Sequence, residues 1–374
     1  MAHISYSIKK KVFIFLFIIN LILLMLYSYV LVDPNITLIN HPLWTTFRNS
    51  MVYIGYYKRP LSTFFFVMLI ISLGAWNIYA HRLSFRPLHI SLLIGLILLF
   101  SYPFLSHDFF NYIFDAKILT FYHKNPYLYK ALDFPGDPYL RFMHWTHRTY
   151  PYGPFWLIIS SIPSFLSAHK FLLNFLFLKM TFGALYVIST YILEKSNKKH
   201  ALFFATNPLV IMEGLVSPHN DLAAVTLGII FLFFIMAQNK KLLGGVFLLL
   251  SILIKYITIF LLGFLIPMKK RIQITTSIFL CGIILLYLIV KNGVFPWYFL
   301  NIFVFLPFCG RRTKMALTIF TVILCITYLP FILYGDWTKQ TLQFRSQIFW
   351  VGVVISIIVL LIVRYLPKRA FFSK

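Results

Sequence analysis

Residues 12–32 read VFIFLFIINLILLMLYSYVLV, an apolar run without a single charged side chain. A membrane-spanning helix needs about 20 mostly apolar residues, so this run is long enough to cross a bilayer. It follows Lys9, Lys10 and Lys11 but lacks the small-residue cleavage site of a secretory signal peptide, and we therefore interpret it as a retained helix. Apolar runs of similar length recur at 61–80, 88–105, 171–193, 271–290, 314–334 and 346–364.

Further apolar runs are shorter or interrupted, and they lie at 153–168, 200–217, 222–237, 242–268 and 294–309. We expect some of them to be kinked or re-entrant, because irregular backbone is tolerated at membrane depth where protein buries it. The sequence thus predicts an all-α, polytopic integral membrane protein with about 10–12 transmembrane helices. We assign one transmembrane domain, 1–374, with the first three spans in 12–105, an outer loop with interfacial helices in 106–152, and the remaining spans in 153–366.

The charge of the chain is strongly positive, with 34 Lys and Arg residues against 9 acidic ones and a formal net charge of +25. The basic residues stand in short loops between apolar runs, which is the pattern of membrane topology and argues against a nucleic-acid partner. The three cysteines, Cys281, Cys309 and Cys325, lie in apolar segments without CxxC spacing. We therefore expect neither a disulfide framework nor a metal site.

Lys and Arg concentrate in cytoplasmic loops, so we place every basic cluster, and with them both chain termini, on the cytoplasmic side. The clusters are 9–11, 82–86, 195–199, 240–241, 269–271, 311–314 and 364–369. This assignment requires 242–268 to enter and leave on one face, as two short helices that meet near Lys255 and Tyr256. It also requires 151–193 to cross once, with 153–168 as a half-helix near the outer surface.

The acidic residues then separate by side, although the topology was set from Lys and Arg only. Glu194 alone falls inside, whereas eight of the nine fall on or near the outer side: Asp33, Asp108, Asp115, Asp133, Asp137, Glu213, Asp221 and Asp336. Carboxylates needed merely for solubility would also occur inside. We therefore expect a functional site on the non-cytoplasmic side.

The outer segment begins SHDFFNYIFD at Ser106, directly after an apolar run. If 107–121 forms a helix in the membrane interface, Asp108, Asn111 or Tyr112, and Asp115 share one face. That face would offer polar groups to a cleft. The alternative for Asp108 is a first-turn or N-cap charge, and for Asp115 a structural role is favoured.

A second polar cluster, Glu213 followed by SPHND at 217–221, stands between two apolar runs. Ionisable groups at such depth are costly unless they line a cavity or find partners, so Glu213, His219, Asn220 and Asp221 are candidate binding residues. The plainer interpretation is a turn in which Asn220 or Asp221 caps the following helix.

Lys255 stands alone in GGVFLLLSILIKYITIFLLGF. A lysine at the bilayer centre costs about 2.5–3.5 kcal/mol on insertion scales, a cost that snorkelling relieves in part. The functional interpretation is that Lys255 binds an anionic group such as phosphate, with Arg141 and Arg148 as further donors.

The order of these motifs resembles the polyprenyl-phosphate-mannose-dependent mannosyltransferases of the glycosyltransferase C superfamily. It runs from His107-Asp108 through NPY at 125–127, YPYGPFW at 150–156 and NPLVIMEGLVSPHND at 207–221 to LIKY at 253–256, within about residues 88–300. The resemblance implies that Asp108 is the catalytic base. The family often has Tyr-Pro-Pro where this chain has Tyr150-Pro151-Tyr152, so the sugar stays open.

The expected activity is transfer of mannose or another hexose from a polyprenyl-phosphate donor to a lipid or glycan acceptor on the non-cytoplasmic face. The lipid phosphate is already a good leaving group, so one carboxylate base suffices, neither cofactor nor metal is expected, and a single displacement inverts the anomeric carbon. The alternative activities are an envelope polysaccharide polymerase or ligase and, with less support, a lipid or glycan transporter or flippase. A bacterial plasma membrane is the favoured location.

Overall fold

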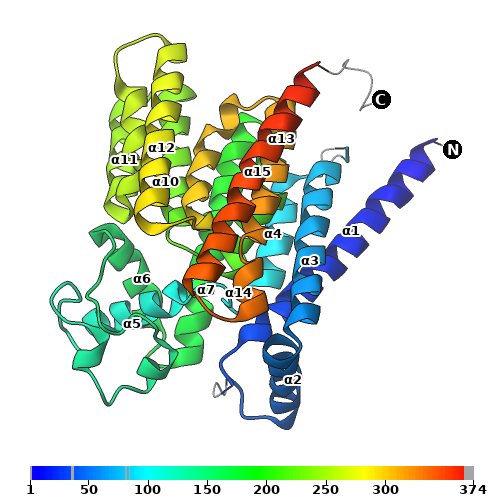
Figure 1. Ribbon diagram of the computed structural model, residues 1–374. Helices are drawn as coiled ribbons and strands as arrows, with labels where there is room; N and C mark the ends of the chain where they lie inside the picture. The colour runs from blue at the N-terminus through cyan, green and yellow to red at the C-terminus, as the bar shows by residue number, and fades with distance from the viewer. Residues whose placement is uncertain (1, 35–37, 81, 84, 366–374) are drawn as a thin grey trace.

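The computed structural model describes residues 2–34, 38–80, 82–83 and 85–365. Within these ranges the regular structure is entirely helical. Figure 1 shows long helices side by side in one bundle, with shorter helices, among them α2 (Pro42–Val52) and α5 (Asp108–Thr120), gathered below it. The expected all-α fold is confirmed.

Six helices are long and apolar enough to cross a membrane. They comprise α1 (Ala2–Tyr27) with η1 (Ser28–Leu31), α3 (Arg59–Ala80), α7 (Phe171–Ser196), α12 (Lys270–Asn292), α13 (Arg311–Ile326) with α14 (Leu329–Tyr334), and α15 (Lys339–Tyr365). Shorter apolar helices are α4 (Pro87–Leu98), α6 (Pro154–Leu166), α11 (Lys241–Ile254), η6 (Tyr256–Leu265) and η7 (Pro296–Phe308). The polytopic membrane character is confirmed, whereas the total of ten to twelve spans stays a prediction.

The run 88–105 forms a shorter helix than we expected. The helix α4 ends at Leu98, and the chain is irregular from Ser101 onward because Pro103 disfavours helical backbone at the residue before it. Buried side chains satisfy the freed backbone: Tyr102 N donates to Ser28 Oγ (2.8 Å) and Leu105 N to Ser217 Oγ (3.2 Å). Such pairing is what permits irregular backbone inside a membrane protein.

The run 242–268 is broken where the sequence predicts, since α11 and η6 meet at Lys255, whose backbone is extended (φ −152°, ψ 119°). Gly153 packs against this break, with its N–H donating to Ile254 O (3.1 Å). A Cβ at Gly153 would lie 1.9 Å from Leu253 O, so only glycine fits this position of the YPYGP motif. The expected half-helix at 153–168 follows directly as α6.

The segment that carries the second polar cluster is a bent helix. It runs through α8 (Lys198–Thr206), α9 (Pro208–Ile211) and η5 (Met212–Val216), turns at 217–220 and continues as α10 (Asp221–Met236), with a bend of 119° between the η5 and α10 parts. Lys179 of α7 holds the bend: its buried ammonium donates to the carbonyls of Leu215 and Val216 and to Ser101 Oγ (2.8 Å).

A buried polar contact ties three helices together. The amide of Asn77 on α3 donates to Phe203 O (3.0 Å) and Thr206 Oγ1 (2.8 Å) on α8 and accepts from Thr318 on α13 (2.6 Å). Such hydrogen bonds are a common link between helices in membranes.

The outer segment is a packed structure that includes η3 (Ala131–Asp133) and η4 (Pro138–Phe142). Lys117 of α5 pairs with Asp137 (2.6 Å), and both side chains are buried. Tyr122 OH and Tyr139 N also donate to this carboxylate (2.6 and 2.7 Å). The expected loop with helices after the first apolar runs is therefore confirmed.

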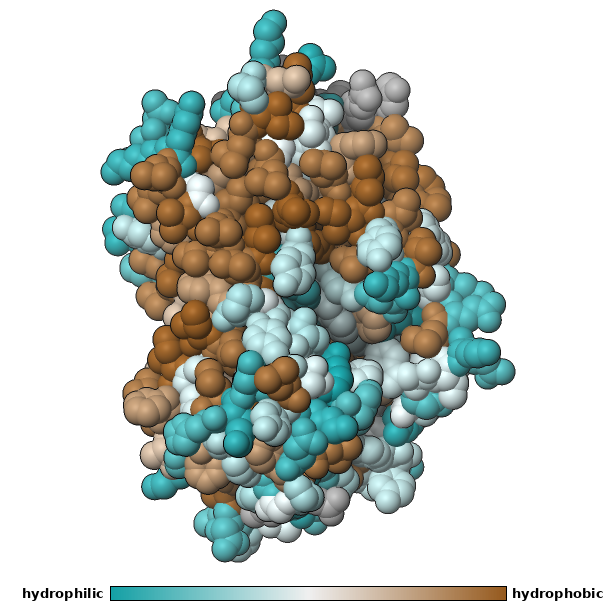
Figure 2. All heavy atoms as spheres, turned by 90° about the vertical axis from the view of Figure 1, so that its left-hand side faces the viewer, coloured by the Kyte–Doolittle hydropathy of each residue, from teal (hydrophilic) through white to brown (hydrophobic). Residues whose placement is uncertain are grey.

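The two ends of the bundle differ. Figure 1 shows the N-terminal end of α1, the end of α3 and the end of α15 at the upper end, while α2 and α5 lie at the lower end. Figure 2 shows a predominantly hydrophobic upper part on this face and a lower part in which hydrophilic and hydrophobic residues are mixed. Which end faces the cytoplasm stays a prediction, and the basic cluster at 364–369 lies largely outside the described residues.

Candidate functional site

Asp108 is the first residue of α5, where the positive end of the helix dipole favours a carboxylate. His219 Nε2 lies 4.0 Å from its Oδ2, and Arg148 Nη2 lies 3.8 Å from its Oδ1. Three segments that are far apart in the sequence therefore meet at one carboxylate. Its first-turn position is compatible with both expectations, a helix-start charge and a reactive group.

His219 lies between two carboxylates. Its Nδ1 is 3.0 Å from Glu213 Oε2, although the N–H is not aligned well enough for a hydrogen bond. Both side chains are buried, with exposures of 1% for His219 and 0% for Glu213. The Trp297 ring stacks on the imidazole at 4.2 Å and fixes its plane.

Lys255 pairs with Asp221, the first residue of α10. Asn301 of η7 donates to the other oxygen of the same carboxylate (3.1 Å), and the Lys255 ammonium lies 5.5 Å from the centre of the Tyr298 ring. The pairing offsets the cost of burying either charge. The Lys255 side chain keeps 21% exposure, whereas the Asp221 side chain is fully buried.

The polar face expected on α5 is present. Tyr112 OH accepts from the backbone N of Asn220 (3.2 Å), and Asn111 Nδ2 reaches Trp145 O (3.5 Å). Asp115 is buried, and burial raises the pKa of its carboxyl to about 8, with the charge of Arg148 acting against the rise and that of Asp108 adding to it.

The two expected arginine donors differ in position. Arg148 lies beside Asp108, within 3.5 Å of Tyr152 OH and with its guanidinium over the Trp145 ring. Arg141 is exposed in η4, over the Phe142 ring at 5.5 Å. Arg148 thus belongs to the cluster around Asp108, while a role for Arg141 stays a prediction.

Asn220 is fully buried, and its side-chain oxygen and nitrogen have no hydrogen-bond partner among the described residues. The same holds for the carboxylate oxygens of Glu213. Buried polar atoms are nearly always paired. Several unpaired polar atoms in a single bend therefore indicate a functional role and not a stabilising one.

Arg345 of α15 is a member of this region that the sequence analysis missed. Its side chain is buried (2% exposed), and its guanidinium lies over the Phe295, Tyr328 and Trp337 rings at 4.7, 5.1 and 5.2 Å. Glu213 and Tyr328 are its electrostatic neighbours. A charged residue inside an apolar run is a candidate binding residue, as argued for Lys255. Our last apolar run begins at 346, one residue after Arg345, and therefore excludes it.

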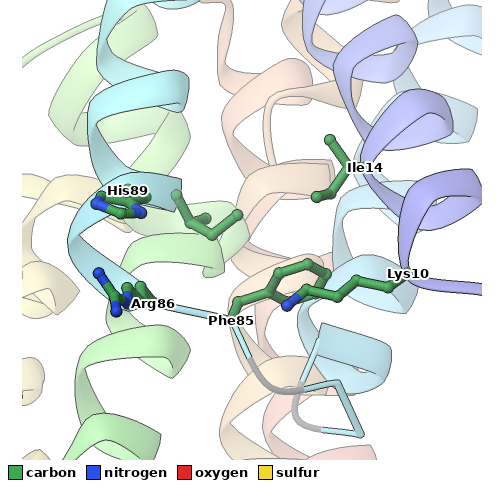
Figure 3. Close-up of a pocket in the computed structure, with 6 residues that line it drawn as sticks. Lys10, Ile14, Phe85, Arg86 and His89 are labelled. Atoms are coloured by element: carbon green, nitrogen blue, oxygen red, sulfur yellow. The ribbon is translucent and has the colours of Figure 1, made fainter. Parts of the chain in front are cut away.

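A cavity of about 410 Å³ lies elsewhere, where the start of α4 meets α1. Figure 3 shows His89 on α4, Arg86 just before that helix, and Lys10 and Ile14 on α1 around the cavity, with the Phe85 ring between them. The residues that line it include no carboxylate, and it therefore offers no base of the Asp108 kind.

Residues 28–271 match a protein-family model, the MptA_B family, which is described as alpha-(1→6)-mannopyranosyltransferase, N-terminal domain. The chain belongs to this family. It is a membrane glycosyltransferase of the mannosyltransferase type. The matched range contains Asp108, the bent helix and Lys255 but ends before Trp297 and Arg345. Neither the curated proteins nor the solved structures contain a significant match.

Proposed function

We propose that this mannosyltransferase moves mannose from a polyprenyl-phosphate donor to a hydroxyl of a lipid or glycan acceptor, with Asp108 as the general base. The observation that carries the proposal is exposure. The Asp108 side chain is 17% exposed, whereas the Glu213 and Asp221 side chains are 0% exposed. Among these three carboxylates, Asp108 is the one an acceptor hydroxyl can reach.

The reaction is a single displacement. The acceptor O–H bond breaks and its proton passes to Asp108, while the acceptor oxygen attacks the anomeric carbon. The bond from that carbon to the phosphate oxygen breaks, and its electron pair leaves with the lipid phosphate. The configuration at the anomeric carbon inverts, because attack and departure occur on opposite faces.

The departing phosphate needs fixed positive groups. Lys255 and Arg148 supply them in this proposal, since both are partly exposed at 21% and 35%. Each already holds a carboxylate, Asp221 or Asp108, so the bound phosphate would share these cations. Tyr112, His219 and Asn220 are further binding candidates around the same bend.

The proposed stereochemistry gives a sharp expectation about the donor. The family is named for an α-(1→6) product, and a single inverting displacement makes an α product only from a β-linked donor. We therefore expect transfer from the β anomer of a polyprenyl-phosphate mannose and none from the α anomer. Transfer from the α anomer would replace the single displacement by a two-step mechanism.

The first test compares transfer of radiolabelled mannose by wild type, Asp108→Asn and Asp133→Asn at equal protein level. Asp133 is an exposed carboxylate of the same outer segment and serves as the matched control. We expect Asp108→Asn to lose about 10²–10⁴-fold in kcat, the usual contribution of a general base, and the control to keep wild-type activity.

Full activity of Asp108→Asn would remove Asp108 from the role of base. If wild type transferred sugar from none of a panel of monosaccharide donors, the polyprenyl-phosphate donor itself would be wrong. Lipid-linked oligosaccharides would then be the next donors to test, as an envelope polymerase or ligase requires.

A further inference from the structure

We propose that His219 accepts the proton that Asp108 takes from the acceptor, with Glu213 orienting the imidazole and Arg345 balancing the charge of Glu213. The inference rests on the proposed function of Asp108 as the base. It adds a proton acceptor and two positioning residues, one of them outside the range that matches the family model.

The imidazole connects the two carboxylates through its two nitrogens. Nδ1 lies 3.0 Å from Glu213 and Nε2 lies 4.0 Å from Asp108. The stacked Trp297 ring, at 4.2 Å and an interplanar angle of 15°, restricts His219 to its present plane. A small in-plane movement therefore suffices to bring Nε2 within hydrogen-bonding distance of Asp108.

A carboxylate with 0% exposure needs a charged partner if it is to stay ionised. Arg345 supplies one, because it is buried and Glu213 is its electrostatic neighbour. None of its three side-chain nitrogens forms an aligned hydrogen bond to a residue that the structure describes. Its guanidinium is instead held among the Phe295, Tyr328 and Trp337 rings, which leaves its charge available to Glu213.

An ionised Glu213 decides which nitrogen of His219 carries the proton. The negative charge 3.0 Å away keeps the proton on Nδ1, and Nε2 presents its lone pair to Asp108. This arrangement also argues against a direct bond from Glu213 to the donor phosphate, because two anions repel each other and His219 stands between Glu213 and Asp108.

The proton balance is closed. The acceptor proton moves to Asp108 Oδ2 and from there to His219 Nε2, so Asp108 becomes a carboxylate again and the imidazolium is flanked by Asp108 and Glu213. After the products leave, the proton returns to water through Asp108, the more exposed of the three side chains.

The pH profile of kcat/KM distinguishes this role from a structural one. Two carboxylates lie next to His219, Asp108 on α5 and Glu213 on η5. Asp108 in turn interacts with Arg148, and Glu213 interacts with Arg345 and Tyr328. Glu213→Gln removes a negative charge 3.0 Å from the imidazole, so it should move the acid limb of the profile to lower pH, besides lowering the plateau.

The experiment uses purified full-length protein in lipid nanodiscs, a β-linked polyprenyl-phosphate mannose and a pH range that covers the acid limb. The variants are Glu213→Gln, His219→Gln and the control His89→Gln, an exposed histidine on α4 at the other cavity. We expect His219→Gln to lower the plateau at least about tenfold and to abolish the limb that Glu213→Gln shifts. An unmoved limb in Glu213→Gln, or a full plateau in His219→Gln, overturns the relay.

A second measurement does not depend on activity. Glu213→Gln and Arg345→Gln each leave one buried charge unpaired, so each should lower the unfolding temperature, and the double variant should lower it by less than the sum of the two shifts. Additive shifts would show that the two residues are not a pair. If wild type transferred no sugar, the proposed function would fail. The comparison of unfolding temperatures would still test whether Glu213 and Arg345 are a pair.

Discussion

At the scale of single residues, surroundings give the carboxylates of one region different properties. Asp108 is partly exposed beside Arg148, whereas Asp221 is buried against Lys255 and Asn301. Asp115 is buried, and burial raises the pKa of its carboxyl to about 8. The same functional group thus has three different surroundings in one region, and the proposed base, Asp108, is the most exposed of the three.

Asp115→Asn tests the neutral state of that carboxyl. Because the folded-state pKa is raised above its usual value of 3.8, the folded protein binds a proton that the unfolded chain releases, and stability falls as pH rises from about 4 to about 8. Asparagine removes this dependence. In thermal unfolding we expect the variant to gain stability relative to wild type from pH 5 to pH 8, with Asp133→Asn as the control.

A constant difference between Asp115→Asn and wild type over that pH range would show that Asp115 is ionised in the folded protein. Its charge would then be paired with Arg148, and the α5 face would carry two anions instead of one.

At the scale of elements, the site depends on two interruptions of helices. The bend between η5 and α10 holds Glu213 and His219, and the break between α11 and η6 holds Lys255. Each interruption has its own support: the ammonium of Lys179 caps the carbonyls at the bend, and Gly153 lets the outer segment pack against the break.

Lys179→Met removes the support of the bend. The carbonyls of Leu215 and Val216 lose their buried donor, and an unsatisfied buried polar group costs about 1–3 kcal/mol. We expect a lower unfolding temperature together with loss of transfer. Lys170→Met, an exposed lysine just before the same helix α7, is the control and should behave as wild type.

Gly153→Ala tests the second support. The added Cβ would meet Leu253 O at 1.9 Å, so the outer segment must move away from α11 and Lys255. We expect a raised KM for the donor and a lower unfolding temperature. The matched control is Gly183→Ala on α7, where a Cβ meets nothing within 4 Å and alanine favours the helix. Equal behaviour of the two variants would contradict this account of the YPYGP motif.

At the scale of the whole molecule, the separation of charges sets the expected orientation. The acid-rich α5 end lies opposite the end at which α1 begins and α15 ends (Figure 1). If the basic turns are cytoplasmic, the Asp108 cluster faces outward and both substrates reach it from the outer leaflet.

Cysteine labelling on intact cells measures that orientation. In a background with the three native cysteines changed to serine, Lys124→Cys in the outer segment should react with a membrane-impermeant maleimide. Gln238→Cys, in the turn between α10 and α11, should react only after the membrane is opened. Both positions are exposed, so access to the reagent depends on the side of the membrane. The reverse pattern would place the active site inside.

The sequence by itself determined the properties that depend on neighbouring residues and on composition. Apolar runs of bilayer length predicted the helical membrane fold, and the positions of the basic clusters predicted the break near Lys255 that the structure contains. The three-to-four spacing from Asp108 placed the polar face of α5. Each of these follows from a period or a length along one segment, which can be read without knowing what packs against it.

Only the tertiary structure decided which charges meet. Asp221 pairs with Lys255, the charge of Glu213 interacts with that of Arg345, and Lys179 caps a bend on a different helix. The end of α4 at Leu98 was equally hidden, because the irregular backbone after it depends on Ser28 and Ser217 from distant segments. Inside an apolar bundle a polar group is tolerated only when a partner reaches it, and packing between helices, not sequence spacing, determines that partner.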